Sequence, residues 1–156
     1  MSFRLSSVRL AAALAAFAVT AGFASVAHAD DSAALAAAAK EPGAVVTASG
    51  LVYKSLAEGK GASPKATDTV KVNYKGTFVD GNKFDASADH GGAISFPLNR
   101  VIPCWTEGVQ KLKVGGKAKL TCPGSIAYGE RGAGSGLIPP NATLVFEVEL
   151  LGVNGK

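Results

Sequence analysis

Short segments in which apolar and polar residues alternate recur from residue 51 to the end of the chain, separated by turn residues. A period of two is typical of strands with one buried face. It predicts strands over 51–56, 70–74 with the adjoining 75–79, 84–85, 94–98, 117–122 and 142–151. Asp80-Gly81 predicts a hairpin turn, and Pro97 predicts an edge position for its strand.

Residues 105–112 are the segment with a helical pattern, because Trp105, Val109 and Leu112 fall on one face and Thr106 is a candidate N-cap. The predicted fold class is therefore α+β, with a curved antiparallel β-sheet of five to six strands wrapped around one short α-helix.

Residues 1–29 have the composition of a secretory signal peptide. Arg4 and Arg9 form a short basic region, an uncharged Ala-rich run follows, and Ala27-His28-Ala29 is an A-x-A cleavage site. An uncleaved membrane anchor is the alternative, but the run does not end in a basic stop-transfer cluster. We expect an exported protein without a stable membrane anchor, located in the periplasm or, as the alternative, secreted.

Removing 29 of the 156 residues leaves 127, enough for one domain with its own core. We assign residues 30–49 to an Ala-rich N-terminal leader and residues 50–153 to the folded domain. Residues 30–40 could form a short helix that Pro42-Gly43 ends, and we interpret this leader as frayed. It has too few large apolar residues for a dimerisation arm, which favours a monomer.

The formal charge of +4 falls to +2 once Arg4 and Arg9 are removed, and no element carries a basic cluster. Nucleic acid is therefore not an expected partner. Cys104 and Cys122 are too far apart for a C-x-x-C redox pair and too few for a zinc site. In an exported protein they form either one disulfide or two buried free thiols, and the spacing does not decide between them.

Hydrolytic, metal and nucleotide chemistry lack their usual residues. His90 is the one histidine of the predicted mature chain, and no G-x-S-x-G motif accompanies it. Asp85, Asp89 and His90 could hold a metal, but a solvated turn is the better interpretation because no second ligand set follows. The loop 129–136 lacks the Lys-Ser/Thr of a P-loop and is interpreted as a flexible flap. We expect no metal and no cofactor.

What remains is a set of aromatic residues with a few polar groups beside them: Tyr74, Phe84, Trp105, Tyr128 and Phe146. Each ring alone is more often part of a core than of a site. The two phenols need partners if buried, and Asp85 follows Phe84 directly. Such a set is better suited to binding a peptide and rotating one of its bonds than to hydrolysing it.

Six motifs occur in an order that resembles the FKBP-type peptidyl-prolyl cis-trans isomerases, the immunophilins inhibited by macrolides. They are VNYKG (72–76), DGNKFDAS (80–87), VIPCW (101–105), EGVQKLKVGGKAKL (107–120), AYG (127–129) and LIPPNATLVFEVELL (137–151). The resemblance covers about residues 50–153 and is similar above all to short exported bacterial members.

The resemblance implies a hydrophobic pocket between sheet and helix. Trp105 would form its floor, and the polar handles would be Asp85 and Tyr128. The backbone N–H of Ile102 would meet a substrate or drug carbonyl. The walls and the flap would come from Tyr74, Phe84, Ile94, Val101, Ile102, Phe146, Leu137 and Ile138. Ile94 is expected where many members have an aromatic wall residue.

The function implied is acceleration of X–Pro isomerisation in exported polypeptides, with Asp85, Tyr128, Phe84 and Trp105 as catalytic residues and macrolides as inhibitors. Two other functions remain open. The same pocket could grip proline-containing segments as a chaperone module with weak or no catalysis, or the domain could be purely structural.

Overall fold

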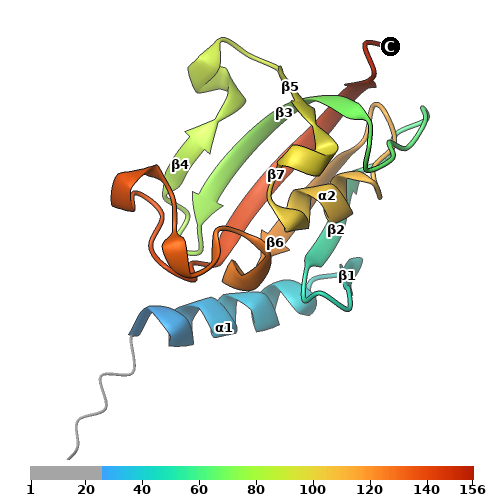
Figure 1. The fold of residues 1–156 in the computed structure, drawn as a ribbon. Coiled ribbons are helices and arrows are strands. Elements are labelled where there is room, and N and C mark those ends of the chain that lie inside the picture. The colour runs from blue at the N-terminus through green and yellow to red at the C-terminus, as the bar shows by residue number, and fades with distance from the viewer. Residues whose placement is uncertain (1–25) are drawn as a thin grey trace, which may run out of the picture.

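The computed structural model describes residues 26–156, which form one antiparallel sheet with a helix packed on each side (Figure 1). The strands are β1 (Ala44–Val46), β2 (Val52–Ala57), β3 (Thr69–Phe78), β4 (Lys83–Ala86), β5 (Ile94–Pro97), β6 (Lys117–Cys122) and β7 (Leu144–Val153). The helices are α1 (Val26–Ala39) and α2 (Pro103–Val109). The α+β prediction is confirmed, although the sheet has seven strands.

The long strands β3 and β7 form the centre of the sheet, whose order is β1-β2-β6-β7-β3-β4. Side chains on β7 alternate between buried and more exposed, as expected for a strand with one face in the core. Phe146, Val148 and Leu150 belong to the buried face and pack in one cluster with residues of α2. This face of the sheet therefore carries the core.

One edge of β3 pairs with two short strands in succession. Its first half pairs with β5 and its second half with β4, while β7 occupies the other edge throughout. Residues 87–93 connect β4 to β5 and form a short 3-10 turn, η1 (Ser87–His90). Pro97 lies in β5, which pairs with β3 alone, so the predicted edge position is confirmed.

Helix α2 begins two residues before the predicted start. Pro103 occupies the first turn, where its missing N–H costs nothing, and Ile102 is the N-cap. The prediction of Thr106 as N-cap is wrong, because its hydroxyl donates to the carbonyl of Leu98 at 2.7 Å. The contact ties the helix to the preceding turn η2 (Leu98–Arg100).

A disulfide joins Cys104 in α2 to Cys122 at the end of β6, with the two Cα atoms 5.9 Å apart. Both residues are fully buried. The bridge resolves the choice that the sequence left open, and it links α2 to the sheet beneath it.

Helix α1 packs on the other face of the sheet, so the predicted frayed leader is wrong for residues 31–41. Ala38 is 7% exposed, and the carboxylate of Asp31 accepts a hydrogen bond from the backbone N–H of Thr143 at 2.9 Å. A hollow of about 320 Å³ between helix and sheet is lined by Ala34, Ala38, Thr77 and Val145 among others. The helix docks because small side chains let it approach closely.

Glu41, just after α1, fixes this docking by bridging two strands. Its carboxylate lies 2.8 Å from Lys54 on β2 and 2.7 Å from Lys119 on β6. Hydrogen bonds from Lys119 and Lys54 lower the pKa of Glu41 from 4.5 to about 2. Sequence patterns could not show this contact, because it joins positions 13 and 78 residues apart.

The first 25 residues of the predicted signal peptide lie outside the described residues. No helix in the part of the chain that the structure describes has the length and apolar character needed to cross a bilayer.

Candidate functional site

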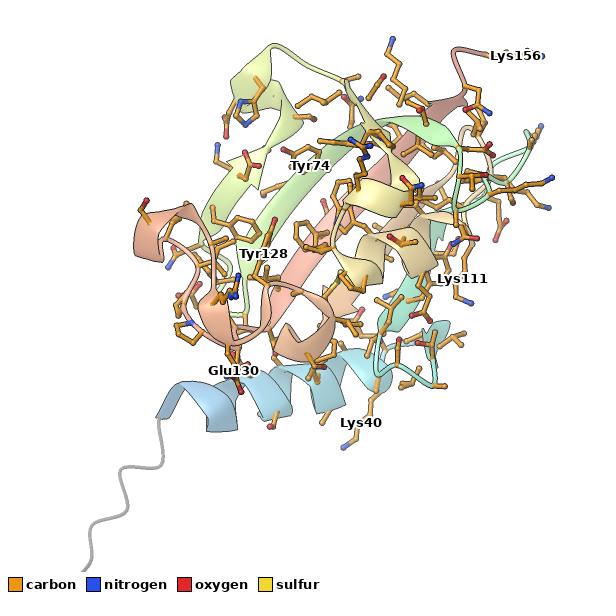
Figure 2. The ribbon with its side chains drawn as sticks, viewed as in Figure 1. Lys40, Tyr74, Lys111, Tyr128, Glu130 and Lys156 are labelled. Carbon is orange, nitrogen blue, oxygen red and sulfur yellow. A yellow bond between two sulfur atoms is a disulfide. The ribbon has the colours of Figure 1, made fainter. Side chains whose placement is uncertain are left out.

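A cavity of about 290 Å³ opens between the core face of the sheet, the start of α2 and the segment after β6. Tyr74 reaches it from β3 and Tyr128 from the segment between β6 and β7 (Figure 2). Its lining consists of Tyr74, Phe84, Asp85, Phe96, Arg100, Val101, Ile102, Trp105, Tyr128 and Phe146. Most of these side chains are apolar or aromatic, which suits an apolar ring of a ligand.

Trp105 is the residue around which the other rings are arranged. Its indole is edge-on to Tyr74, Phe96 and Phe146, with ring centroids 5.2, 5.8 and 5.4 Å away. The side chain is 5% exposed, and its Nε1 is buried without a hydrogen-bond partner among the described residues. A buried donor without a partner costs free energy, so this N–H is a group that a bound ligand could satisfy.

Gly76 on β3 makes room for the aromatic wall. A Cβ at this position would lie 2.5 Å from the ring of Phe84 and 3.0 Å from that of Phe146. Those two rings meet edge-on, with centroids 5.6 Å apart. The glycine is therefore required for the rings to lie against the strand.

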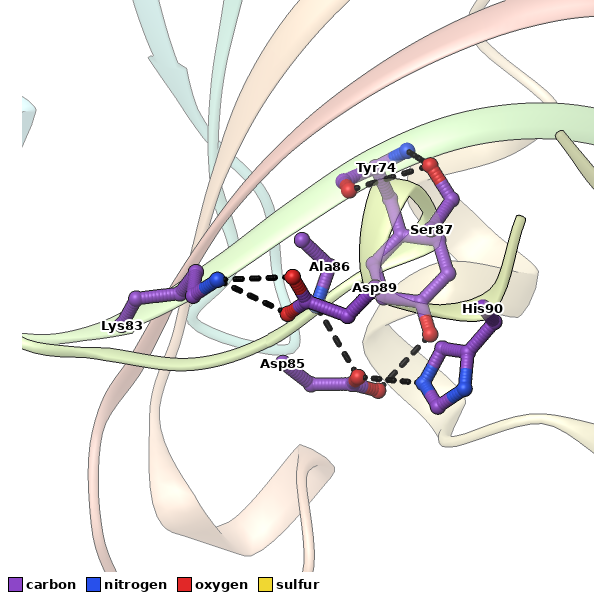
Figure 3. A network of polar contacts seen from close by, with 7 residues as sticks. All are labelled: Tyr74, Lys83, Asp85, Ala86, Ser87, Asp89 and His90. Atoms are coloured by element: carbon purple, nitrogen blue, oxygen red, sulfur yellow. Dashed lines mark hydrogen bonds and ion pairs between the residues drawn. The ribbon is translucent and has the colours of Figure 1, made fainter. Parts of the chain in front are cut away.

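Asp85 is held by three donors at the edge of the cavity (Figure 3). The Tyr74 hydroxyl donates to Oδ2 at 2.7 Å. Oδ1 accepts from the backbone N–H of Ala86 at 2.9 Å and lies 2.8 Å from Nε2 of His90. The position of the carboxylate is thus fixed by groups from β3, β4 and η1.

These contacts set the charge of Asp85. Burial raises the pKa of the carboxyl, but hydrogen bonds from Tyr74 and His90 outweigh it, so the pKa lies below its ordinary value. Asp85 is therefore ionised at neutral pH. Burial and the bond to Asp85 raise the pKa of Tyr74, which keeps its hydroxyl protonated as a donor.

Two further donors belong to residues that line the cavity, and neither has a hydrogen-bond partner within the described residues. The phenol of Tyr128, a residue 38% exposed, forms no hydrogen bond within the described residues. Burial and the charge of Asp85 raise its pKa, so it stays protonated. The N–H of Ile102 likewise has no acceptor in the described part of the chain, because it precedes the first turn of α2. Both donors are free to bind carbonyl oxygens of a ligand.

The structure brings together eight of the eleven residues that the sequence nominated: Tyr74, Phe84, Asp85, Val101, Ile102, Trp105, Tyr128 and Phe146. Leu137 is 56% exposed on the loop outside the lining, and Ile138 is buried in the core cluster. Ile94 lies at the far end of β5, paired with Val72. The cavity has Phe96 on that strand instead.

Sequence reasoning missed Phe96, Arg100 and His90. Phe96 shares the face of Ile94 two residues along β5, so the choice between them depended on register, which the β3–β5 pairing sets. His90 was assigned to a solvated turn. Its side chain is 53% exposed, but the turn η1 folds it back onto Asp85.

A wider hollow of about 570 Å³ also involves β3, but it is lined mainly by polar and charged side chains, among them Lys75, Lys117 and Glu147. These residues alternate along their strands with those of the core face. Because charged groups keep their water, this hollow does not offer the dry surroundings of the aromatic cavity.

Comparison with known proteins identifies relatives of this chain. Residues 60–151 match the family model of the FKBP-type peptidyl-prolyl cis-trans isomerases. The FKBP-type peptidyl-prolyl cis-trans isomerase FkpA of Aeromonas hydrophila is 59% identical over 119 residues, and that of Escherichia coli K12 is 54% identical over 115. These matches cover 76% and 74% of this chain but 44% and 42% of the relatives, so the chain spans less than half of their length.

Solved structures show the same fold. The crystal structure of FkpA from Escherichia coli matches with a TM-score of 0.78 and 50% identity, over 81% of this chain and 59% of that one. A peptidyl-prolyl cis-trans isomerase from Pseudomonas syringae matches with a TM-score of 0.74 and 36% identity, over 81% of this chain and 94% of that one.

Proposed function

Because the chain belongs to the FKBP-type peptidyl-prolyl cis-trans isomerase family, we propose that it catalyses rotation about X–Pro peptide bonds in polypeptides that bind the aromatic cavity. The observation that carries this proposal is the cavity of about 290 Å³ around Trp105, whose lining among the described residues is mostly aromatic and aliphatic, with polar groups of Tyr74, Asp85 and Tyr128 beside the rings. Its chemistry fits a reaction in which no bond is broken.

The energetic demand on such a site is modest. Rotation about a peptide bond has a barrier of about 18–20 kcal/mol, because resonance stabilises the planar amide. At X–Pro the cis and trans states differ by only about 1 kcal/mol, so a catalyst needs to favour the twisted state over both. A millionfold acceleration requires about 8 kcal/mol of such differential binding.

The cavity can favour the twisted amide over the planar states in three ways. The prolyl ring would lie against Trp105 among rings that exclude water, where a twisted amide with its less polar carbonyl loses less solvation than a planar one. The Tyr128 hydroxyl would hold the carbonyl of the residue before proline while the bond turns. Asp85, ionised and held rigidly, would contribute a fixed field at the cavity edge rather than a proton.

The test is a proline-limited refolding assay with and without a macrolide inhibitor. The proposal predicts acceleration of the slow phase and its loss on addition of the macrolide. If the purified protein binds unfolded chains but leaves the slow phase unchanged, it is a chaperone module. Leu137, an apolar residue 56% exposed on the loop after β6, is the observation that favours this second function.

We further propose that residues 1–29 direct export to the periplasm, that cleavage precedes Asp30, and that the clients are exported polypeptides containing proline. Such cleavage would retain Asp31 and its contact with Thr143. The protein is proposed to act as a monomer. Mass spectrometry of the periplasmic fraction and sedimentation of the purified protein test these points.

A further inference from the structure

Two charged side chains line the cavity. They differ in whether groups of the protein itself bind them. Asp85 is paired with the Tyr74 hydroxyl, the Ala86 N–H and His90. Arg100, an exposed residue, forms no ion pair and no side-chain hydrogen bond within the described residues. A ligand at the mouth therefore meets a carboxylate that already has hydrogen-bond partners and a guanidinium that has none among the described residues.

The backbone that carries Arg100 is held firmly. Leu98, at the start of the same turn, is fully buried, and its N–H donates to the Asp68 carbonyl at 2.9 Å. Its carbonyl accepts from the Thr106 hydroxyl at 2.7 Å. Arg100 thus extends from a fixed point two residues before Ile102, so its guanidinium stays within reach of the cavity mouth.

The two free donors define the direction in which a substrate would run. On the proposed function, Tyr128 holds the carbonyl before the proline, which leaves the Ile102 N–H for the next carbonyl, that of the proline itself. The chain after the proline then leaves the cavity along the segment that contains Arg100. The residue before the proline lies on the side of Tyr128 and Asp85.

We propose that Arg100 is a specificity-determining residue, which favours substrates with an acidic side chain directly after the proline. The inference rests on the proposed function and adds to it a preference on the side of the substrate that follows the rotating bond. The guanidinium is a permanent charge with several donors, well suited to a carboxylate.

The size of the expected preference follows from the exposure of the ion pair that Arg100 would form with a substrate carboxylate. Ion pairs at exposed sites change binding by a modest amount, which corresponds to about two- to fivefold in kcat/KM for a Pro-Glu peptide over its Pro-Gln counterpart. Because such pairs are screened by salt, the ratio should approach one at about 1 M ionic strength.

The experiment measures cis–trans exchange by NMR in four peptides of the form Ala-Leu-Pro-Xaa-Ala and Ala-Xaa-Pro-Leu-Ala, with Xaa either Glu or Gln. The full chain is compared with Arg100→Gln and Arg100→Glu. Lys113→Gln, which removes one positive charge from an exposed position outside the cavity lining, is the matched control.

The wild type and Lys113→Gln should prefer Glu after the proline by two- to fivefold. Arg100→Gln should abolish this preference, Arg100→Glu should reverse it, and Glu before the proline should gain nothing from Arg100. An unchanged ratio in Arg100→Gln overturns the inference while isomerase activity persists. If no peptide is accelerated, the proposed function itself fails; Trp105 fluorescence titrations then decide whether binding retains the Arg100-dependent preference.

Discussion

Removing the hydroxyl of Tyr128 offers a clean test of the mechanism, because that group has no role in holding the fold. It forms no hydrogen bond within the described residues and belongs to a side chain 38% exposed. Tyr128→Phe should therefore change the free energy of unfolding by less than about 0.5 kcal/mol. Any loss of activity can then be assigned to the missing contact with substrate.

The expected loss follows from the strength of one hydrogen bond. A neutral hydrogen bond contributes about 0.5–1.5 kcal/mol net, which corresponds to a two- to tenfold decrease in rate. If the phenol binds the carbonyl more strongly in the twisted state than in the planar states, the decrease appears in kcat rather than in KM.

The assay is cis–trans exchange measured by NMR on an X–Pro peptide, together with urea unfolding of each variant. Tyr53→Phe is the matched control, since the Tyr53 hydroxyl lies 3.5 Å from the Lys111 carbonyl, outside the cavity lining, and should leave activity unchanged. Wild-type kcat in Tyr128→Phe would refute the assigned role. So would a decrease that the loss of folded protein explains fully.

Four other predictions follow from contacts described above. Phe84→Ala removes a cavity wall worth roughly 2 kcal/mol of apolar contact and should lower kcat/KM by up to about 30-fold, measured with the same peptide. Glu41→Gln should cost about 1 kcal/mol of unfolding free energy at pH 7. Because the folded pKa is depressed from 4.5 to about 2, this difference should be fully present above pH 4.5 and be lost as the pH falls through about 2. Replacing Cys104 and Cys122 by serine should cost about 3 kcal/mol in urea unfolding, since the bridge closes a loop with a sequence separation of 18. Macrolide binding should change the fluorescence of Trp105, and a flat titration at micromolar drug would count against this residue as the cavity floor.

The elements with regular alternation could be predicted from the sequence, and those that depend on contacts across the sheet could not. The pattern of β7 is clear because its inner face packs entirely in the core. Strand β1 was missed because it is three residues long, with Val45 and Val46 both more than half exposed, and it exists through pairing with β2. The docking of α1 was missed for a similar reason, since Ala38 and Glu41 have partners far away in the sequence.

The same distinction applies to the candidate site. Trp105, Phe84 and Asp85 lie in motifs that indicate their neighbourhood, and the cavity contains all three. Phe96 and Ile94 occupy the same face of one strand, so only the register against β3 shows which of them reaches Trp105. His90 could not be assigned from the sequence, because the turn η1 brings its exposed ring onto the partly exposed carboxylate of Asp85.

The placement of α1 has a practical consequence for experiments on this protein. Ala36 is exposed on that helix. The helix covers residues such as Thr77 and Val145, which lie on the face of the sheet opposite the cavity. A dye or surface linker coupled to a cysteine at position 36 would therefore leave the peptide entrance open. Single-molecule recordings of client capture could be made on immobilised molecules without blocking the groove that they probe.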